Sequence, residues 1–236
     1  MMSTSTRRGG TLALLGGGEW KGGCRELDTD LAAVAGAKEV VVIPAAAAYE
    51  HPERIADRAT SYFEGLGLKA RTLAVIHRSE ADDPKIADAV RKARFVYLCD
   101  GSPLHLRSVL KGSALFDAIL GAYHGGASVA ASGAGATLVG DPMVDPRGGA
   151  YTVGLAMVPD LAIFPYHGTA AHHLRERSID LLPSTAKLVG IDDETALVRD
   201  RDGSWRVAGA GVVTVYEGRD AREYAAGVAI NELTTR

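Results

Sequence analysis

The sequence predicts one α/β domain in which helices cover both faces of a mainly parallel sheet, a three-layer sandwich. Short apolar runs rich in β-branched residues alternate with amphipathic stretches of helical period, and this alternation is typical of strand–helix–strand units. The run Val40–Ile43 is continuous and apolar, as expected for a strand buried on both faces. The 236 residues, 47% of them apolar, are enough for a large core.

The first part of the chain holds five predicted strands and the helices between them. Gly65 and Gly67 end the first of these helices, and Pro84 suits the first turn of the next. The predicted strands are Thr11–Leu15, Val40–Ile43, Ala70–Ile76, Arg94–Cys99 and Ala127–Ala131. The predicted helices are His51–Leu66, Asp83–Lys92, Pro103–Leu110 and Ala114–Tyr123.

The last third of the chain is richer in short β segments, and Asp202-Gly203 is a strong hairpin signal between two of them. No Pro- or Ser-rich linker and no repeat interrupts the sequence, so we expect an antiparallel extension of the same sheet. The predicted elements are the strands Leu161–Phe164, Lys187–Ile191, Ala196–Arg199, Trp205–Ala208 and Val212–Tyr216 and the helix Ala170–Leu182. Residues 11–236 are thus expected to form one domain after a flexible tail over residues 1–10.

Composition argues against several classes of partner. The net charge of −3, with scattered Lys and Arg, indicates no nucleic-acid partner. No apolar run approaches the ~20 residues that span a bilayer, and Met1–Gly10 lacks the apolar stretch of a signal peptide, so a cytoplasmic protein without a membrane partner is expected. Cys24 and Cys99 lack metal-ligand spacing and are expected to be buried, idle thiols, although a disulfide is left open.

Four segments directly follow predicted strands, where ligands bind in an open parallel sheet. They are Gly16–Glu19, Pro44–Ala48, Asp100–Pro103 and Ser132–Ala136. The glycines of the first segment allow a ligand to approach the backbone and expose N–H groups to an anion or oxyanion, although a plain tight turn is an equal alternative.

Two kinds of cofactor are weighed and not expected. Gly16, Gly18 and Gly22 have the spacing of a variant dinucleotide loop, but no carboxylate ends the second strand to hold a ribose. His172 and His173 are adjacent and point in different directions on a helix, and no HExxH pattern is present. No cofactor and no metal ion is therefore predicted.

The segment Ala131–Thr137 has the small residues of a nucleophile elbow, the sharp bend between a strand and a helix where a hydrolase presents its nucleophile. Small residues also suit a close helix–strand contact. His167 follows a predicted strand and is a candidate general base for Ser132, with a structural histidine as the alternative.

Together these segments resemble the cyanophycinase and dipeptidase E group, the S51 serine peptidases, from about Thr11 to Tyr216. The resemblance implies a fold similar to class I glutamine amidotransferases. The family pattern runs GGGE, IPTAS, GG-x-Q, GTSAGA, DQH and IDEDTA. Gly16–Glu19 matches the first motif, and Ile191–Ala196 closely matches the last.

The departures from the family pattern concern the catalytic motifs. The resemblance places Gly133 at the nucleophile position of GTSAGA. Ala45 and Ala47 stand at the two hydroxyl positions of IPTAS. In the DQH segment His167 is kept, but the acidic residue before it is lost. Asp100–Pro103 lacks the glutamine of GG-x-Q. The substrate-binding positions that the resemblance implies are Gly17, Gly18, Glu19, Asp100, Gly101, Ser102, Arg175 and Glu194.

These degenerate motifs predict a family member that is weak or inactive as a peptidase and binds a peptide or small molecule in the old cleft. Glycine has no side-chain atom that can attack, and loss of the nucleophile costs a serine hydrolase on the order of 10⁶-fold in rate. The alternative is an active serine hydrolase, in which a one-residue slip lets Ser132 act with His167 on a dipeptide or isopeptide. A third hypothesis uses Cys99 as the nucleophile, and a homodimer is expected by analogy with the fold group.

Overall fold

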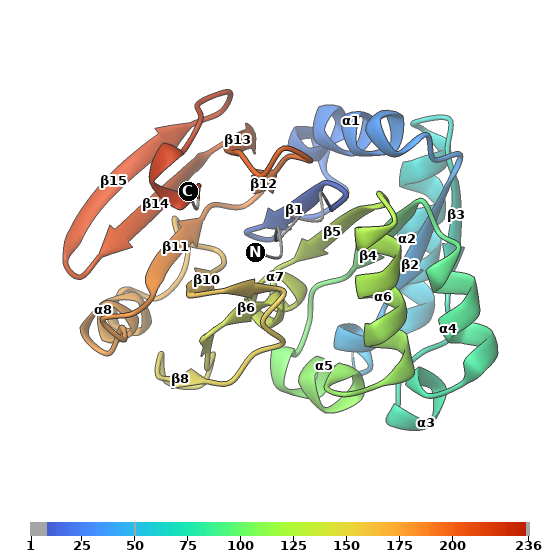
Figure 1. Ribbon diagram of the computed structural model, residues 1–236, viewed down its shortest axis with the longest axis horizontal. Coiled ribbons are helices and arrows are strands. Elements are labelled where there is room, and N and C mark those ends of the chain that lie inside the picture. The colour runs from blue at the N-terminus through green and yellow to red at the C-terminus, as the bar shows by residue number, and fades with distance from the viewer. Residues whose placement is uncertain (1–8, 50, 235–236) are drawn as a thin grey trace, which may run out of the picture.

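The computed structural model describes residues 9–49 and 51–234. These residues form an α/β structure with two principal β-sheets, one flanked by helices on both faces (Figure 1). The predicted fold class is thereby confirmed. The described part of the tail is packed, because the N–H of Gly10 donates to the carbonyl of Tyr123 at 2.6 Å; the tail predicted over residues 1–8 lies outside the described residues.

The first sheet has the order β13-β12-β1-β5-β4-β2-β3. The five strands from β1 to β3 in this order are parallel, whereas β12 and β13 are antiparallel to their neighbours. Its strands are β1 (Leu12–Leu15), β2 (Glu39–Ile43), β3 (Lys69–Thr72), β4 (Phe95–Leu98), β5 (Ser128–Ser132), β12 (Thr195–Arg199) and β13 (Trp205–Gly209).

Helices cover both faces of this sheet because its strands are apolar on both faces. Successive side chains of a strand point to opposite sides. Leu12 and Leu14 therefore join the core under α4 to α7, whereas Ala13 and Leu15 join the core under α1 and α2. The helices are α1 (Arg25–Ala35), α2 (Pro52–Glu64), α3 (Arg78–Ala81), α4 (Pro84–Arg91), α5 (Pro103–Leu110), α6 (Ala114–His124) and α7 (Ala134–Val139).

The C-terminal part forms a second sheet, which corrects the predicted extension of the first. Only β12 and β13 extend the first sheet, and the other strands form the order β15-β14-β11-β10-β6-β9. Ile163 and Val189 face the first sheet in one shared core, while Phe164 and Leu188 pack with Ile179 of α8 (His172–Asp180) on the outer face. Both faces of the second sheet are thus buried, and strands added to the edge of the first sheet would not be covered in this way. The strands are β6 (Gly140–Asp141), β9 (Val158–Pro159), β10 (Leu161–Phe164), β11 (Lys187–Ile191), β14 (Val212–Glu217) and β15 (Asp220–Ala225), beside the small pair β7 (Met143–Val144) and β8 (Tyr151–Thr152).

The predicted third strand is too long. It ends at Thr72, because after Leu73 donates to Val42 the chain turns and Val75 donates back to Leu73. Helices α1 and α3, the two-residue strands β6 to β9 and strand β15 were not predicted. The buried Leu27 and Leu31 of α1 do have helical spacing, but a short charged segment after a glycine turn gave little signal.

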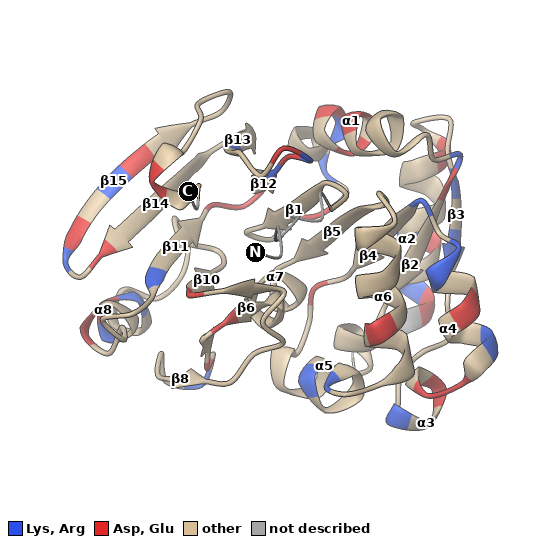
Figure 2. Ribbon diagram, viewed as in Figure 1, with Lys and Arg blue, Asp and Glu red and all other residues tan. Residues whose placement is uncertain are grey.

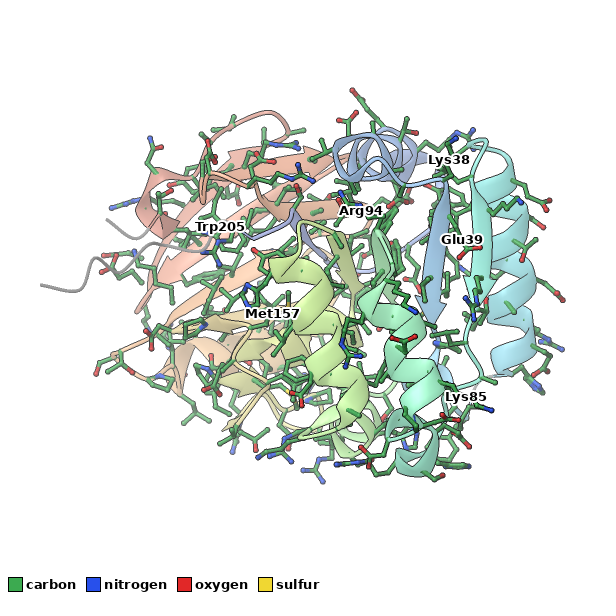
Figure 3. The ribbon with its side chains drawn as sticks, turned by 45° about the vertical axis from the view of Figure 1, so that its right-hand side comes forward. Lys38, Glu39, Lys85, Arg94, Met157 and Trp205 are labelled. Carbon is green, nitrogen blue, oxygen red and sulfur yellow. The ribbon has the colours of Figure 1, made fainter. Side chains whose placement is uncertain are left out.

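The hairpin predicted at Asp202-Gly203 is confirmed between β12 and β13. Gly203 has a φ of +89°, and Asp200 N–H donates to the Ser204 carbonyl at 2.9 Å across the turn. Trp205 then begins β13 (Figure 3). The guanidinium of Arg199 lies 5.8 Å from the centroid of its ring.

Charged residues lie mainly on the outer helices and on β15, and the central strands β4 and β5 contain none (Figure 2). A carboxylate that directly follows one of these uncharged strands, such as Asp100 after β4, is therefore a candidate for a role in a site. Among the helices of the described residues, none is long and apolar enough to cross a membrane.

Candidate active site

The loops after β1, β4 and β5 lie side by side because these strands are neighbours in register. Leu15 of β1 pairs with Ser132 of β5, and Leu98 of β4 pairs with Ala131. The strands are parallel, so the three loops leave the same edge of the sheet. This is the crevice in which open α/β sheets bind ligands.

Gly133 forms a sharp bend between β5 and α7. Its φ of 46° and ψ of −102° lie where residues with a side chain are strained. Its N–H donates to the carbonyl of Leu15 at 3.0 Å, and its carbonyl accepts the N–H of Thr137 at 2.9 Å, the first turn of α7. Gly133 thus has the backbone geometry of a nucleophile elbow without a side chain.

Ser132, the last residue of β5, is directed to a different loop. Its side chain is fully buried, and its Oγ donates to Oε2 of the buried Glu19 at 2.8 Å. His167 is not a partner of this hydroxyl among the hydrogen bonds of the described residues. The slipped arrangement therefore lacks its serine–histidine contact here.

Ser132→Ala is expected to lower the free energy of unfolding by about 1–3 kcal/mol, because it removes the shorter of two hydrogen bonds to the buried Glu19 carboxylate and leaves only that from the Asp100 N–H at 3.4 Å. Urea unfolding at pH 7 measures the change. Ser128→Ala is the matched control, since the buried Ser128 hydroxyl donates to a neutral acceptor, the carbonyl of Leu31 at 2.7 Å; a cost of about 0.5–1.5 kcal/mol is expected there. A smaller loss for Ser132→Ala than for Ser128→Ala would contradict the role assigned to Ser132.

The Asp100 carboxylate occupies the space beside the elbow. Its Oδ1 accepts the N–H of Ala134 at 2.7 Å and that of Gly101 at 2.7 Å. A Cβ atom built on Gly133 would lie 2.0 Å from the same oxygen. The N–H of the residue after the elbow, together with one from a neighbouring loop, is the donor pair that forms an oxyanion hole in α/β hydrolases. Here a carboxylate of the chain itself accepts both donors.

His167 follows β10 and is buried, with 8% of its surface exposed. Its Nε2 lies 2.7 Å from the hydroxyl of Tyr216, and its Nδ1 lies 3.7 Å from Oδ1 of Asp192. Burial lowers the pKa of His167 and the nearby Arg175 lowers it further, while Asp192 opposes the shift. The imidazole is thus held between Tyr216 and Asp192, away from Ser132.

Two cavities meet at this edge of the sheet, each of about 400 Å³. They share Asp100, Gly101 and Tyr166. The first is mostly apolar, and its other lining residues are Pro103, Ala134, Thr137, Val144, Asp145, Pro146, Gly149, Phe164, Pro165, Thr169, Ala170, Ala171 and Leu174. The second is polar, and its other lining residues are Gly18, Glu19, Lys21, Ile55, Arg58 and Asp193.

Four of the eight predicted binding residues line these cavities: Gly18, Glu19, Asp100 and Gly101. The other four, Gly17, Ser102, Arg175 and Glu194, line neither cavity.

All four have local contacts of their own, and Nε of Arg175 lies 4.0 Å from Oε1 of Glu176. Ser102 begins α5, where its Oγ accepts the N–H of His105 at 3.3 Å. Glu194 accepts the N–H of Gly23 at 3.0 Å. A Cβ atom on Gly17 would lie 2.2 Å from the Tyr166 ring, so this glycine makes room for that side chain.

The glycine loop itself is held by the turn before β12. Gly16 N–H donates to the carbonyl of Thr195 at 3.0 Å, and Gly17 accepts the N–H of Glu194 at 2.9 Å. The two segments that match the family pattern best are therefore bonded to each other. The sequence analysis did not place Tyr166, Asp193 or Tyr216 at the site. A tyrosine shortly after a strand could have indicated Tyr166, and an acidic run directly after a strand could have indicated Asp193.

Neither cysteine has the features of a nucleophile. Cys24 and Cys99 are free and buried. Burial raises the pKa of Cys99 well above its usual value, with Glu19 and Asp100 adding to the shift, and burial is also the main cause that raises the pKa of Cys24 to about 12. Because the thiolate is the reactive form, this environment argues against the hypothesis of a Cys99 nucleophile. The residues that the structure describes contain no group of three or more His, Cys, Asp or Glu able to hold a metal ion.

An elbow between a central parallel strand and a helix, with two backbone donors beside it, is the local arrangement by which hydrolases on α/β sheets present a nucleophile. The sequence profile of Peptidase family S51 matches residues 12–206, and the chain belongs to this family.

Similar proteins agree with this assignment. The cyanophycinase of Trichormus variabilis is 26% identical over 220 residues, which cover 86% of this chain and 72% of that protein. The cyanophycinase of Geminocystis herdmanii is 25% identical over 89% of this chain and 81% of its own length. A crystal structure of a peptidase from an acI-B1 actinobacterium is similar with a TM-score of 0.85 and 26% identity, covering 94% of this chain and 97% of that one. A structure of a putative peptidase E protein from Listeria monocytogenes, 16% identical with a TM-score of 0.63 over 93% of this chain and 100% of that one, shows the shared fold alone.

Proposed function

We propose that this S51 family member does not act as a serine peptidase and instead binds a small organic ligand or short peptide in the cleft. The single observation that carries the proposal is the Asp100 carboxylate beside the side-chain-free Gly133. It accepts the N–H groups of Gly101 and Ala134, each at 2.7 Å. The site therefore lacks both requirements of acyl transfer, an attacking atom at the elbow and free donors for a developing oxyanion.

The electrostatics of this arrangement oppose the family reaction. A tetrahedral intermediate places negative charge between the two backbone donors. A carboxylate already held there repels that charge and also takes its hydrogen bonds. Removal of even one oxyanion donor costs about 10²–10³ in rate in a serine hydrolase, and here both are engaged.

The alternative, hydrolysis through Ser132 and His167, requires the two side chains to meet. Ser132 is bonded to Glu19 at 2.8 Å, and His167 is bonded to Tyr216 at 2.7 Å. Both are buried and line neither cavity, so a substrate in the cleft would touch neither.

Labelling with a fluorophosphonate and hydrolysis of a dipeptide and isopeptide panel test the proposal. We expect no labelling above that of the denatured chain, and the same background hydrolysis for the wild-type protein and Ser132→Ala. Labelling at Ser132 that is lost in Ser132→Ala together with turnover would instead establish the hydrolase. The homodimer and the cytoplasmic location stay predictions.

A further inference from the structure

Of the two cavities at this edge of the sheet, the apolar one has walls suited to a hydrocarbon group. The walls come from both halves of the chain, with Ala134 on one side and Phe164 and Leu174 on the other. No lysine or arginine is among the described residues that line this cavity. Asp145 also lines it, but both of its carboxylate oxygens accept from Arg147, so this charge is already paired. A volume of about 400 Å³ is in the range of small-molecule sites.

The polar cavity holds charges of both signs that are not paired with each other. Lys21 and Arg58 line it and are exposed, and Glu19 and Asp193 line it as well. Among the described residues no ion pair joins these four side chains. The two carboxylates accept hydrogen bonds from neutral groups, of which the shortest come from hydroxyls at 2.8 Å and 2.9 Å. The Arg58 guanidinium lies 5.6 Å from the centroid of the Trp20 ring, a contact that holds this cation at the cavity.

Tyr166 connects the two cavities, because it lines both of them. Its φ of 54° lies in the left-handed region, which is uncommon for a bulky residue. Two contacts fix this conformation. The N–H of Tyr166 donates to the carbonyl of Gly16 at 2.6 Å, and its ring occupies the space that a side chain on Gly17 would take. Backbone conformations of this kind cluster at ligand sites. A ligand that lies along Tyr166 can therefore place one end in each cavity.

We propose that the site binds a free amino acid with an apolar side chain. The side chain lies in the apolar cavity, the α-ammonium group faces Glu19 and Asp193, and the α-carboxylate faces Lys21 and Arg58. This deepens the proposed function and rests on it, since a free amino acid is a retained ligand only where the elbow performs no acyl transfer. Asp100 is engaged with the elbow, and no part in the recognition is assigned to it.

The mixture of charges favours an amino acid over other ligands with an apolar body. A simple amine would be attracted by the two carboxylates and repelled by the two cations, and a simple carboxylate would meet the reverse. A residue inside a peptide carries neither charge, and a terminal residue carries only one of them. A free amino acid carries both charges on groups bonded to one Cα, so each can lie beside side chains of opposite sign.

Isothermal titration calorimetry on the full chain with four probes tests the inference. L-phenylalanine carries both charges and a benzyl group, L-phenylalaninamide lacks the carboxylate, 3-phenylpropanoate lacks the ammonium group, and glycine lacks the side chain. We expect L-phenylalanine to bind about fivefold more tightly than either singly charged probe, the size of partly exposed ion pairs. It should bind at least about tenfold more tightly than glycine, because the benzyl group is buried.

Removal of the two cations tests the position of the carboxylate. Lys21→Gln combined with Arg58→Gln is expected to weaken L-phenylalanine about fivefold and to leave L-phenylalaninamide unchanged or slightly tighter. Lys69→Gln combined with Arg71→Gln is the matched control. These two residues are exposed on β3, line neither cavity, and undergo the same change of charge. The control is expected to bind all four probes as the wild-type protein does.

A second variant tests the apolar cavity independently of charge. Ala171 lines this cavity and is exposed, so Ala171→Trp places an indole where the benzyl group would lie. His173→Trp adds the same side chain to an exposed position two residues further on that lines neither cavity. Ala171→Trp is expected to weaken L-phenylalanine at least about fivefold relative to His173→Trp.

The outcomes separate this inference from the proposed function. Equal affinity for L-phenylalanine and any one of the other probes, absence of L-phenylalanine binding, or wild-type affinity in both the double variant and Ala171→Trp would overturn the ligand class. None of these results would restore peptidase activity. Labelling of Ser132 by a fluorophosphonate, in contrast, would overturn the proposed function whatever the amino acid does.

Discussion

Gly133→Ala is expected to lower the free energy of unfolding by about 3–5 kcal/mol, a large effect for the addition of one methyl group. The backbone conformation, with φ 46° and ψ −102°, costs a residue with a Cβ about 1–3 kcal/mol. The new methyl would also lie 2.0 Å from Oδ1 of Asp100 and force this carboxylate off the two backbone donors. Hydrogen bonds to a charged group contribute about 1.5–3 kcal/mol each.

A double-mutant cycle separates the two causes. In an Asp100→Gly background the carboxylate is gone, so a methyl group at position 133 has nothing to clash with and no Asp100 hydrogen bonds to break. Gly133→Ala is therefore expected to cost only the free energy of the strained backbone conformation. The difference, a coupling of about 2 kcal/mol between the two positions, is measured by urea unfolding of the four proteins.

Gly112→Ala is the control for the backbone term alone. Gly112 has a φ of +68°, and a Cβ atom there would meet nothing within 4 Å. An equal cost for Gly112→Ala and Gly133→Ala, or a cycle without coupling, would show that Asp100 does not fill the space of the missing side chain.

Strands that are unbroken apolar runs with a turn signal after them could be predicted from the sequence. Val40–Ile43 of the parallel core and Leu161–Phe164 of the second sheet are examples, and both are strands in the structure with ends that agree within one residue. The motif match from Gly16–Glu19 to Ile191–Ala196 added the family, which the matched profile confirms.

The arrangement of the C-terminal strands could not be predicted in the same way. Whether a β segment extends one sheet or begins another depends on which apolar faces it must cover, and this is decided by tertiary packing. Ile163 and Val189 have the same apolar character as Val198, yet the first two lie in the second sheet and Val198 in the first.

The site shows the same limit. The composition of Ala131–Ala136 predicts a bend, and Gly133 has the conformation of one. The sequence places Asp100 in a loop after a strand, and the resemblance makes it a substrate-binding position. Its contact with the elbow depends on β4 and β5 being neighbours in register, which neither of these indicates. The pairing of His167 with Tyr216 joins residues 49 positions apart, and no local pattern indicates it, because His167 lies in the turn after β10 whereas Tyr216 lies on β14.

The second large expected effect is a loss of stability as the pH rises from about 4 to about 7, caused by Asp28 of α1. This carboxyl is fully buried, its Oδ2 accepts the Tyr62 hydroxyl at 2.9 Å, and its Oδ1 has no partner among the described residues. Burial raises the pKa of Asp28 from 3.8 to about 7; the Tyr62 hydrogen bond opposes this shift and the charge of Glu19 adds to it.

The direction follows from which state binds the proton. Between the two pKa values the unfolded chain has lost the proton of Asp28 while the folded chain keeps it, so the folded state binds more protons and stability falls as the pH rises. Each unit of pKa difference is worth about 1.4 kcal/mol, so the contribution of Asp28 falls by an amount on the order of 4 kcal/mol across this window and is constant above it.

Asp28→Asn should remove this pH dependence, because the amide keeps an oxygen acceptor for Tyr62 and does not ionise. Urea unfolding of the wild-type protein and of Asp28→Asn at intervals from pH 4.5 to pH 8 measures the difference, which should grow in favour of the variant up to about pH 7 and then stay level. Asp30→Asn, which removes an exposed carboxylate from the same helix, is the control and should follow the wild-type curve. Parallel curves for Asp28→Asn and the wild-type protein would mean that Asp28 is ionised in the folded chain across the whole range, and that its buried position beside Tyr62 tolerates a charge.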